Sequence, residues 1–145
     1  MITIEVTESA IMKHPETAIE LLSQLKQHGF KISIDDFGTG YSSLAYLKLL
    51  PATELKIDQS FVANILLDEK DEILVRSTVA LAKDLELQVV VEGVETEDVI
   101  GKLHSFGCDM GQGYHYSRPL NPDAYIEWHQ QWNLDKGHGL LSAPD

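Results

Sequence analysis

The chain has 145 residues, 43% of them hydrophobic, and a formal net charge of −12. This length and apolar content predict one folded domain with a core. The negative charge argues against nucleic-acid polymers and anionic membrane surfaces as main partners, since both attract basic proteins. The single cysteine, Cys108, excludes an intrachain disulfide. We expect a cytoplasmic protein, because no apolar stretch is long enough for a bilayer and the N-terminus has no signal-like order.

Predicted strands and helices alternate along most of the chain. Alternating apolar residues mark the strands, helical spacing marks the helices, and proline and glycine mark several helix boundaries. In chain order the predicted elements are a strand (2–6), a helix (14–28), a strand (31–35), a helix (42–50, capped by Ser42 or Ser43), a strand (54–58), a helix (72–85), a strand (88–92), a helix from Thr96 to Gly107, a short strand or loop (108–119) and a final helix from Asn121. We expect a domain over residues 1–134 and a disordered tail over 135–145.

The helix predicted over residues 72–85 is amphipathic. Its apolar residues Ile73, Leu74, Leu81 and Leu85 are expected to form one buried stripe.

Two adjacent aspartates, Asp35 and Asp36, end the second predicted strand. Alternation places Ile32 and Ile34 on one face of this strand, and Ser33 and Asp35 on the other. Neighbouring carboxylates repel each other unless a cation or hydrogen-bond donors compensate, so a divalent metal site and a hydrogen-bonded loop are the two interpretations. A dinucleotide-binding loop is a poorer one, because the glycine motif lacks its third glycine and the carboxylates would repel a pyrophosphate.

Each of the first four predicted strands carries an ionisable residue toward its end. In every case the alternation of the strand places this residue on the face opposite the adjacent apolar side chains. These residues are Glu5, Asp35, Lys56 and Glu92. Strand and helix alternation predicts a parallel β/α sheet, in which ligands bind at the carboxyl ends of the strands. The four residues therefore predict a ligand site, with a mutually satisfied ion-pair cluster as the structural alternative.

Five sequence blocks resemble the successive signature motifs of the EAL domain, a bacterial phosphodiesterase family that hydrolyses cyclic di-GMP. The blocks are IEVTES (4–9), IDDFGTGYSSL (34–44), LKIDQSFV (55–62), VVVEGVET (89–96) and GQGYHYSRP (111–119). The resemblance implies an α/β fold, namely a TIM-type β/α barrel, of which this chain supplies about five β/α units. The family's own E-A-L block and the asparagine-bearing strand after it have no counterpart in the sequence.

The resemblance also implies roles for individual residues. Metal binding falls to Glu5, Asp35 and Asp36, catalysis to Lys56 and Glu92, and supporting or substrate-binding roles to Glu8, Glu95 and Gln112. A loop that couples subunit pairing to metal binding is implied at Phe37, Gly38, Thr39, Gly40, Tyr41, Ser42 and Ser43.

The implied reaction is hydrolysis of cyclic di-GMP to the linear dinucleotide pGpG with two Mg²⁺ or Mn²⁺ ions. Such ions polarise a phosphodiester, lower the pKa of an attacking water and stabilise the leaving oxygen. The first metal site would lack two protein ligands, so a homodimer or the missing N-terminal half of the domain is an expected partner. The alternative function is a non-catalytic module for cyclic di-GMP binding or dimerisation.

Overall fold

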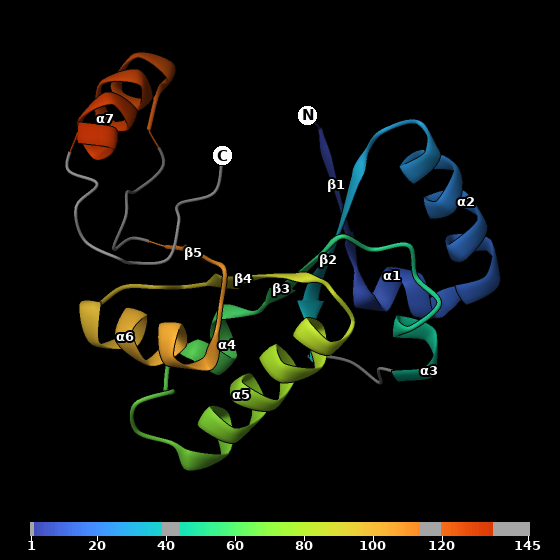
Figure 1. The fold of residues 1–145 in the computed structure, drawn as a ribbon, viewed down its shortest axis with the longest axis horizontal. Coiled ribbons are helices and arrows are strands. Elements are labelled where there is room, and N and C mark those ends of the chain that lie inside the picture. Colours follow the sequence, from blue (N-terminus) through green and yellow to red (C-terminus); the bar gives the residue numbers. More distant parts are fainter. Residues whose placement is uncertain (1, 39–43, 114–119, 135–145) are drawn as a thin grey trace.

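The computed structural model describes residues 2–38, 44–113 and 120–134, and these form an α/β fold (Figure 1). The elements in chain order are β1 (Thr3–Thr7), α1 (Glu8–Lys13), α2 (Pro15–Gln27), β2 (Lys31–Phe37), α3 (Leu44–Leu47), β3 (Glu54–Ile57), α4 (Gln59–Val62), α5 (Glu69–Asp84), β4 (Gln88–Glu92), α6 (Glu97–Phe106), β5 (Met110–Gln112) and α7 (Pro122–Leu134). Among these residues, no helix combines the length and apolar character needed to cross a membrane.

The five strands form one parallel sheet whose order follows the chain, β1-β2-β3-β4-β5. Parallel neighbours need a crossover connection, and helices lie in the connections between successive strands. This succession of β/α units is the arrangement predicted from the sequence. All carboxyl ends of the strands consequently lie at one edge of the sheet.

The two faces of the sheet differ sharply in polarity. On one face Ile34, Leu55 and Val89 are almost completely buried, in a core that also holds side chains from α1, α3, α4, α5 and α6. The opposite face carries Ser33 and Lys56, which are buried polar residues. The predicted alternation is therefore correct, and it separates the core from a polar face on the same strands.

Several predicted helix boundaries are confirmed. The helix predicted over residues 14–28 is α2, which has Pro15 in its first turn. Thr96 caps α6 by accepting a hydrogen bond from the backbone N of Val99, and Gly107 ends this helix with a left-handed φ of 88°. The side chain of Asn121 accepts from the backbone N of Ala124 at the start of α7.

Other expectations were wrong or fall outside the described residues. The short helices α1 and α4 were not predicted. In α5, which begins at Glu69, Ile73 and Leu74 are exposed and the buried positions are Val75, Val79 and Ala82, because the helix is rotated so that a different stripe faces the sheet. The caps expected at Ser42 and Ser43 and the tail 135–145 lie outside the described residues.

Candidate active site at the carboxyl edge of the sheet

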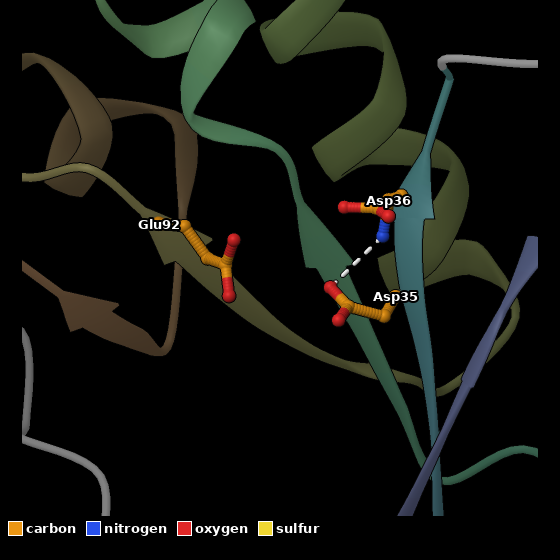
Figure 2. A group of neighbouring side chains, drawn as sticks. All are labelled: Asp35, Asp36 and Glu92. Carbon is orange, nitrogen blue, oxygen red and sulfur yellow. Dashed lines mark hydrogen bonds between the residues drawn. The ribbon is translucent and has the colours of Figure 1, made fainter.

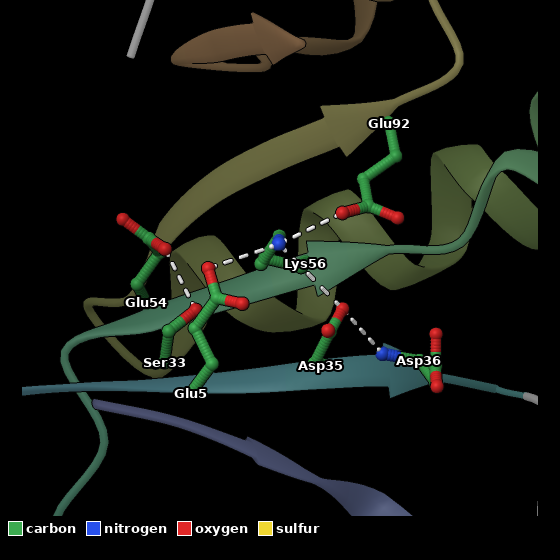
Figure 3. A network of polar contacts seen from close by, with 7 residues as sticks. All are labelled: Glu5, Ser33, Asp35, Asp36, Glu54, Lys56 and Glu92. Atoms are coloured by element: carbon green, nitrogen blue, oxygen red, sulfur yellow. Dashed lines mark hydrogen bonds and ion pairs between the residues drawn. The ribbon is translucent and has the colours of Figure 1, made fainter. Parts of the chain in front are cut away.

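Lys56 lies at the centre of a cluster of charges contributed by four strands (Figure 3). Its side chain extends from β3 and is only 6% exposed. The Nζ atom lies 2.7 Å from Oε1 of Glu92 on β4 and 3.0 Å from Oε1 of Glu5 on β1. Oδ1 of Asp35 on β2 is 3.8 Å away. The structure thus brings together all four strand residues that the sequence singled out by parity.

The three carboxylates keep the Lys56 side chain protonated. Burial alone lowers the pKa of a lysine, because it penalises the charged form. Hydrogen bonds from Lys56 to Glu92 and Glu5, with the further charge of Asp35, outweigh that penalty and raise the pKa of Lys56 above its ordinary value. The ammonium is therefore a fixed positive charge of the site.

A β-bulge presents Asp35 and Asp36 together. The register of β2 against β3 shifts between Ile34 and Phe37, and Asp36 has a left-handed φ of 55°. Its backbone N–H donates to Oδ1 of Asp35 at 2.9 Å. Burial, followed by the charges of Asp35 and Asp58, raises the pKa of Asp36, although Lys56 acts in the opposite direction. The bulge therefore holds two mutually repelling carboxylates side by side.

Asp35, Asp36 and Glu92 form a candidate cation site (Figure 2). One carboxylate oxygen from each of the three lies within 4.8 Å of the others, and all three side chains are partly exposed. Hard divalent cations prefer such oxygen ligands. This group includes Glu92, whose predicted role was catalytic. Glu5, a predicted metal ligand, accepts a hydrogen bond from Lys56, and its metal role stays a prediction.

Glu8 supports the segment that follows the two aspartates. It is 4% exposed, and its Oε2 accepts a hydrogen bond of 2.9 Å from the backbone N of Gly38. Phe37 packs in the core and Gly38 has a left-handed φ of 95°. Of the loop predicted to couple dimerisation to metal binding, only these two residues are described, and residues 39–43 lie outside the described part of the chain.

Gln112 and Glu95 lie on the elements next to Glu92. Gln112 pairs with Glu92 in the register of β4 and β5, and its carbonyl accepts from the backbone N of Val94. Its side chain is exposed. Glu95 is also exposed and lines a cavity of about 490 Å³ together with Gln59, Leu66 and other residues.

One polar pair on this face was not predicted. The Ser33 hydroxyl, in a completely buried residue, donates to Oε1 of Glu54 at 2.7 Å. These residues precede Asp35 and Lys56 by two positions, so they share the same face and form a row below the charged cluster. The alternation that placed Lys56 on this face could also have identified Glu54.

The ion-pair cluster that the sequence analysis gave as the structural alternative is present. It shares Asp35 and Glu92 with the candidate cation site.

Comparison with known proteins gives consistent matches. The family model described as "EAL domain" matches residues 1–119. The cyclic di-GMP phosphodiesterase NbdA of Pseudomonas aeruginosa is 43% identical over 139 residues, which are 96% of this chain and 18% of that protein. The chain therefore spans less than a fifth of the length of this relative.

Solved structures match at similar levels. A cyclic di-GMP complex of the PaMucR phosphodiesterase has a TM-score of 0.82 at 46% sequence identity, and the match covers 85% of this chain and 50% of that chain. A manganese and cyclic di-GMP complex of Klebsiella pneumoniae BlrP1 at pH 9.0 has a TM-score of 0.75 at 36% identity, with coverage of 81% and 30%.

Proposed function

The chain belongs to the EAL domain family, and from this premise we propose that residues 1–134 form the C-terminal part of a cyclic di-GMP phosphodiesterase domain. The observation that carries the proposal is the convergence of Lys56, Glu92, Asp35 and Asp36 at the carboxyl edge of a parallel β/α sheet. In folds of this kind the carboxyl edge is where ligands bind. The related structures named above contain cyclic di-GMP, and one contains manganese.

Divalent cation binding fits the residues present. Asp35, Asp36 and Glu92 supply three carboxylates of the type that Mg²⁺ and Mn²⁺ prefer. Burial first, and then the charges of Asp35 and Asp58, raise the pKa of Asp36, and a cation would offset the repulsion between these carboxylates. We propose these three residues as the ligands of one ion. When bound, the ion supplies charge stabilisation for a phosphodiester and lowers the pKa of an attacking water.

The other side chains of the site contribute binding and orientation. The Lys56 ammonium presents a fixed positive charge where a phosphate oxygen or the attacking water can contact it. Glu92 lies in both groups, so it couples the position of Lys56 to that of the cation. Glu8 fixes the backbone at Gly38, and Gln112 and Glu95 are proposed to contact the substrate. Hydrolysis of one phosphodiester opens the cyclic dinucleotide to linear pGpG.

A second candidate is a module that binds cyclic di-GMP without hydrolysing it. The contact of Glu5 supports this function. Glu5 accepts a hydrogen bond from Lys56, and among the described residues the candidate cation group consists of Asp35, Asp36 and Glu92. We also propose pairing of two copies through the loop at residues 37–43, by analogy with the family. A cytoplasmic location remains a prediction from the sequence.

Cyclic di-GMP hydrolysis tests the proposal directly. The chain is incubated with cyclic di-GMP and Mn²⁺ or Mg²⁺, and pGpG is quantified by chromatography, beside Asp35→Asn. Asp98→Asn, on the exposed first turn of α6, is the matched control. We expect turnover in the parent chain and in the control, and none in Asp35→Asn. If cyclic di-GMP raises the melting temperature of the parent chain but is not cleaved, the binding module is correct instead.

A further inference from the structure

A cavity with a volume of about 490 Å³ lies between α4, the turn that follows it, and the start of α6. Its walls come from residues 59–67 and 93–99. We propose that this α4–α6 cavity docks a basic amphipathic helix of a partner protein. The proposal does not depend on the cation site or on hydrolysis. It rests on the exposed leucines of one wall and on the charges around the opening.

Two neighbouring leucines line the cavity and are open to solvent. Leu67 is 89% exposed, the largest value among the large hydrophobic side chains that the structure describes, and Leu66 is 48% exposed. Val62, which also lines the cavity, is almost completely buried, so the cavity is apolar at its base as well. Removal of apolar surface from water is favourable. An apolar side chain that enters the cavity and covers the two leucines would therefore gain binding free energy.

The turn that carries these leucines is held in place. Ile65 is almost completely buried in the core, and its backbone N–H donates to the carbonyl of Val62 at 3.2 Å. The N–H groups of Leu67 and Asp68 both donate to the carbonyl of Asn64 at 2.8 Å. Because this wall is already ordered, docking does not have to order it first, and the entropic cost of binding is smaller.

The opening of the cavity is acidic. The two wall segments contain three acidic residues and no lysine, arginine or histidine, and two more acidic residues follow the first segment directly. These five exposed residues, named here the acidic rim, are Asp68, Glu69, Glu95, Glu97 and Asp98. The helix dipole accounts for acidic residues in the first turns of α5 and α6, but not for Glu95, which precedes α6. Basic side chains are the charges that complement this rim.

The acidic rim argues against other occupants. A twofold dimer built on the cavity would place the same patch of both copies face to face, and the two rims would repel each other. Nucleic acids and anionic membranes are disfavoured for the same reason. The wall segments contain no strand residues, so they offer no strand edge to an extended peptide. A helix with apolar side chains on one face and basic side chains beside them fits both the cavity and its rim.

Binding of synthetic helices tests the proposal without metal or cyclic di-GMP. The probe is a helix of about 14 residues with leucine on one face and lysine beside it, stapled because free helices of this length are marginal in water. A scrambled peptide of the same composition and a peptide with glutamate in place of lysine are its controls. Fluorescence anisotropy measures the affinity, and NMR identifies the backbone amides that shift. We expect saturable binding of the basic amphipathic helix alone, with shifts at Ala63, Leu66 and Val99.

Two leucine variants separate docking in the cavity from general attraction to an acidic protein. Leu67→Gln should weaken binding of the basic amphipathic helix at least about tenfold, because the apolar contact is lost. Leu74→Gln, at an exposed position of α5 outside the cavity, is the matched control and should change the affinity by less than about twofold. Both leucines are exposed, so both variants are expected to fold, and their melting temperatures check this.

A pair of double variants tests the acidic rim. Glu97→Gln combined with Asp98→Asn should weaken binding several-fold at low salt and reduce its salt dependence. Glu16→Gln combined with Glu20→Gln removes the same charge at exposed positions of α2 and should have a much smaller effect.

The contrary results are equally specific. Equal binding of the scrambled peptide, binding unaffected by Leu67→Gln, or no binding of the basic amphipathic helix would each overturn the proposal. Analytical ultracentrifugation tests a second copy as the occupant, because a dimer that Leu67→Gln dissociates would show that this face pairs with itself. None of these results bears on the proposed phosphodiesterase function, which the hydrolysis assay tests separately.

Discussion

The Glu8 carboxylate accepts a hydrogen bond of 2.9 Å from the backbone N–H of Gly38, and thereby joins the start of α1 to the end of β2. Glu8→Ala removes this hydrogen bond to a carboxylate that is itself buried, and should cost about 1.5–3 kcal/mol of unfolding free energy. Glu8→Gln keeps an acceptor and should cost less. Urea denaturation measures both losses, and hydrogen exchange at Gly38 should accelerate in Glu8→Ala.

Glu20→Ala is the control for this prediction. It lies on the exposed side of α2 and should change the free energy of unfolding by no more than about 0.5 kcal/mol. Equal stability of Glu8→Ala and Glu20→Ala would contradict the supporting role of Glu8.

Gly93 follows Glu92 at a point where no side chain fits. Its φ is +73°, and an added Cβ would lie 2.6 Å from the Cβ of Gln59. Gly93→Ala should therefore cost about 2–4 kcal/mol, from the left-handed conformation and the steric overlap together. Gly29 has φ +89° with nothing within 4 Å of an added Cβ, so Gly29→Ala should cost only about 1–2 kcal/mol. Thermal or urea unfolding measures both, and Gln59→Gly should partly rescue Gly93→Ala. An equal cost for the two alanine variants would show that the overlap is relieved by a small shift of α4.

Asp36 should destabilise the chain when no metal is bound. Its pKa is raised above 3.8, first by burial and then by Asp35 and Asp58, so the ionised form disfavours the folded state. The destabilisation begins as the pH rises through 3.8, the unfolded value, and is complete above the folded pKa. Asp36→Asn should therefore melt higher than the parent chain at pH 7 without metal, with a difference that disappears below about pH 3.8. Asparagine also tolerates the left-handed φ of 55°.

The effect of Mn²⁺ on the melting temperature of Asp36→Asn tests the proposed role of Asp36 as a metal ligand. Mn²⁺ should raise the melting temperature of the parent chain and have little effect on the variant, because a ligand is lost. A lower melting temperature for Asp36→Asn at pH 7 without metal would contradict the electrostatic argument.

Cys108 should be unreactive until the chain unfolds. Burial, with a further contribution from the Asp109 charge, raises the pKa of this thiol to about 12, and its residue is 7% exposed. Since the thiolate is the reactive species, a thiol reagent at pH 8 should modify Cys108 at a rate that follows unfolding. Ser105→Cys, at an exposed position of α6, should add one thiol that reacts at once. Immediate reaction of the parent chain would show that the end of α6 opens locally.

The sequence predicted which charged residues gather at the strand ends, because alternation along a strand is a local property. Glu5, Asp35, Lys56 and Glu92 could each be assigned to the polar face from their immediate neighbours, and the structure brings them together. The sequence could not predict which of these carboxylates pair with Lys56 and which belong to the candidate cation group. This division depends on the bulge at Asp36 and on the reach of the Lys56 side chain across three strands.

Local sequence patterns also predicted some of the helices and missed others. Long helices such as α2 were predicted from spacing, whereas α1 and α4 are too short to show a helical period. Capping was the available signal, since Thr7 and Asp58 each accept a backbone hydrogen bond at the start of these helices. The buried stripe of α5 was misjudged because it depends on how the helix rotates against the sheet.

The row of charges on the sheet also has a consequence for folding. The contact between Lys56 and Glu5 joins residues 51 positions apart, so no short segment of the chain contains the site. If β3 paired with its neighbours one residue out of register, Lys56 would point into the apolar core and Leu55 or Ile57 would face the carboxylates. Such a sheet would bury an unpaired charge. The charged residues at the strand ends therefore also penalise misaligned strands, and they favour the correct sheet as the chain folds.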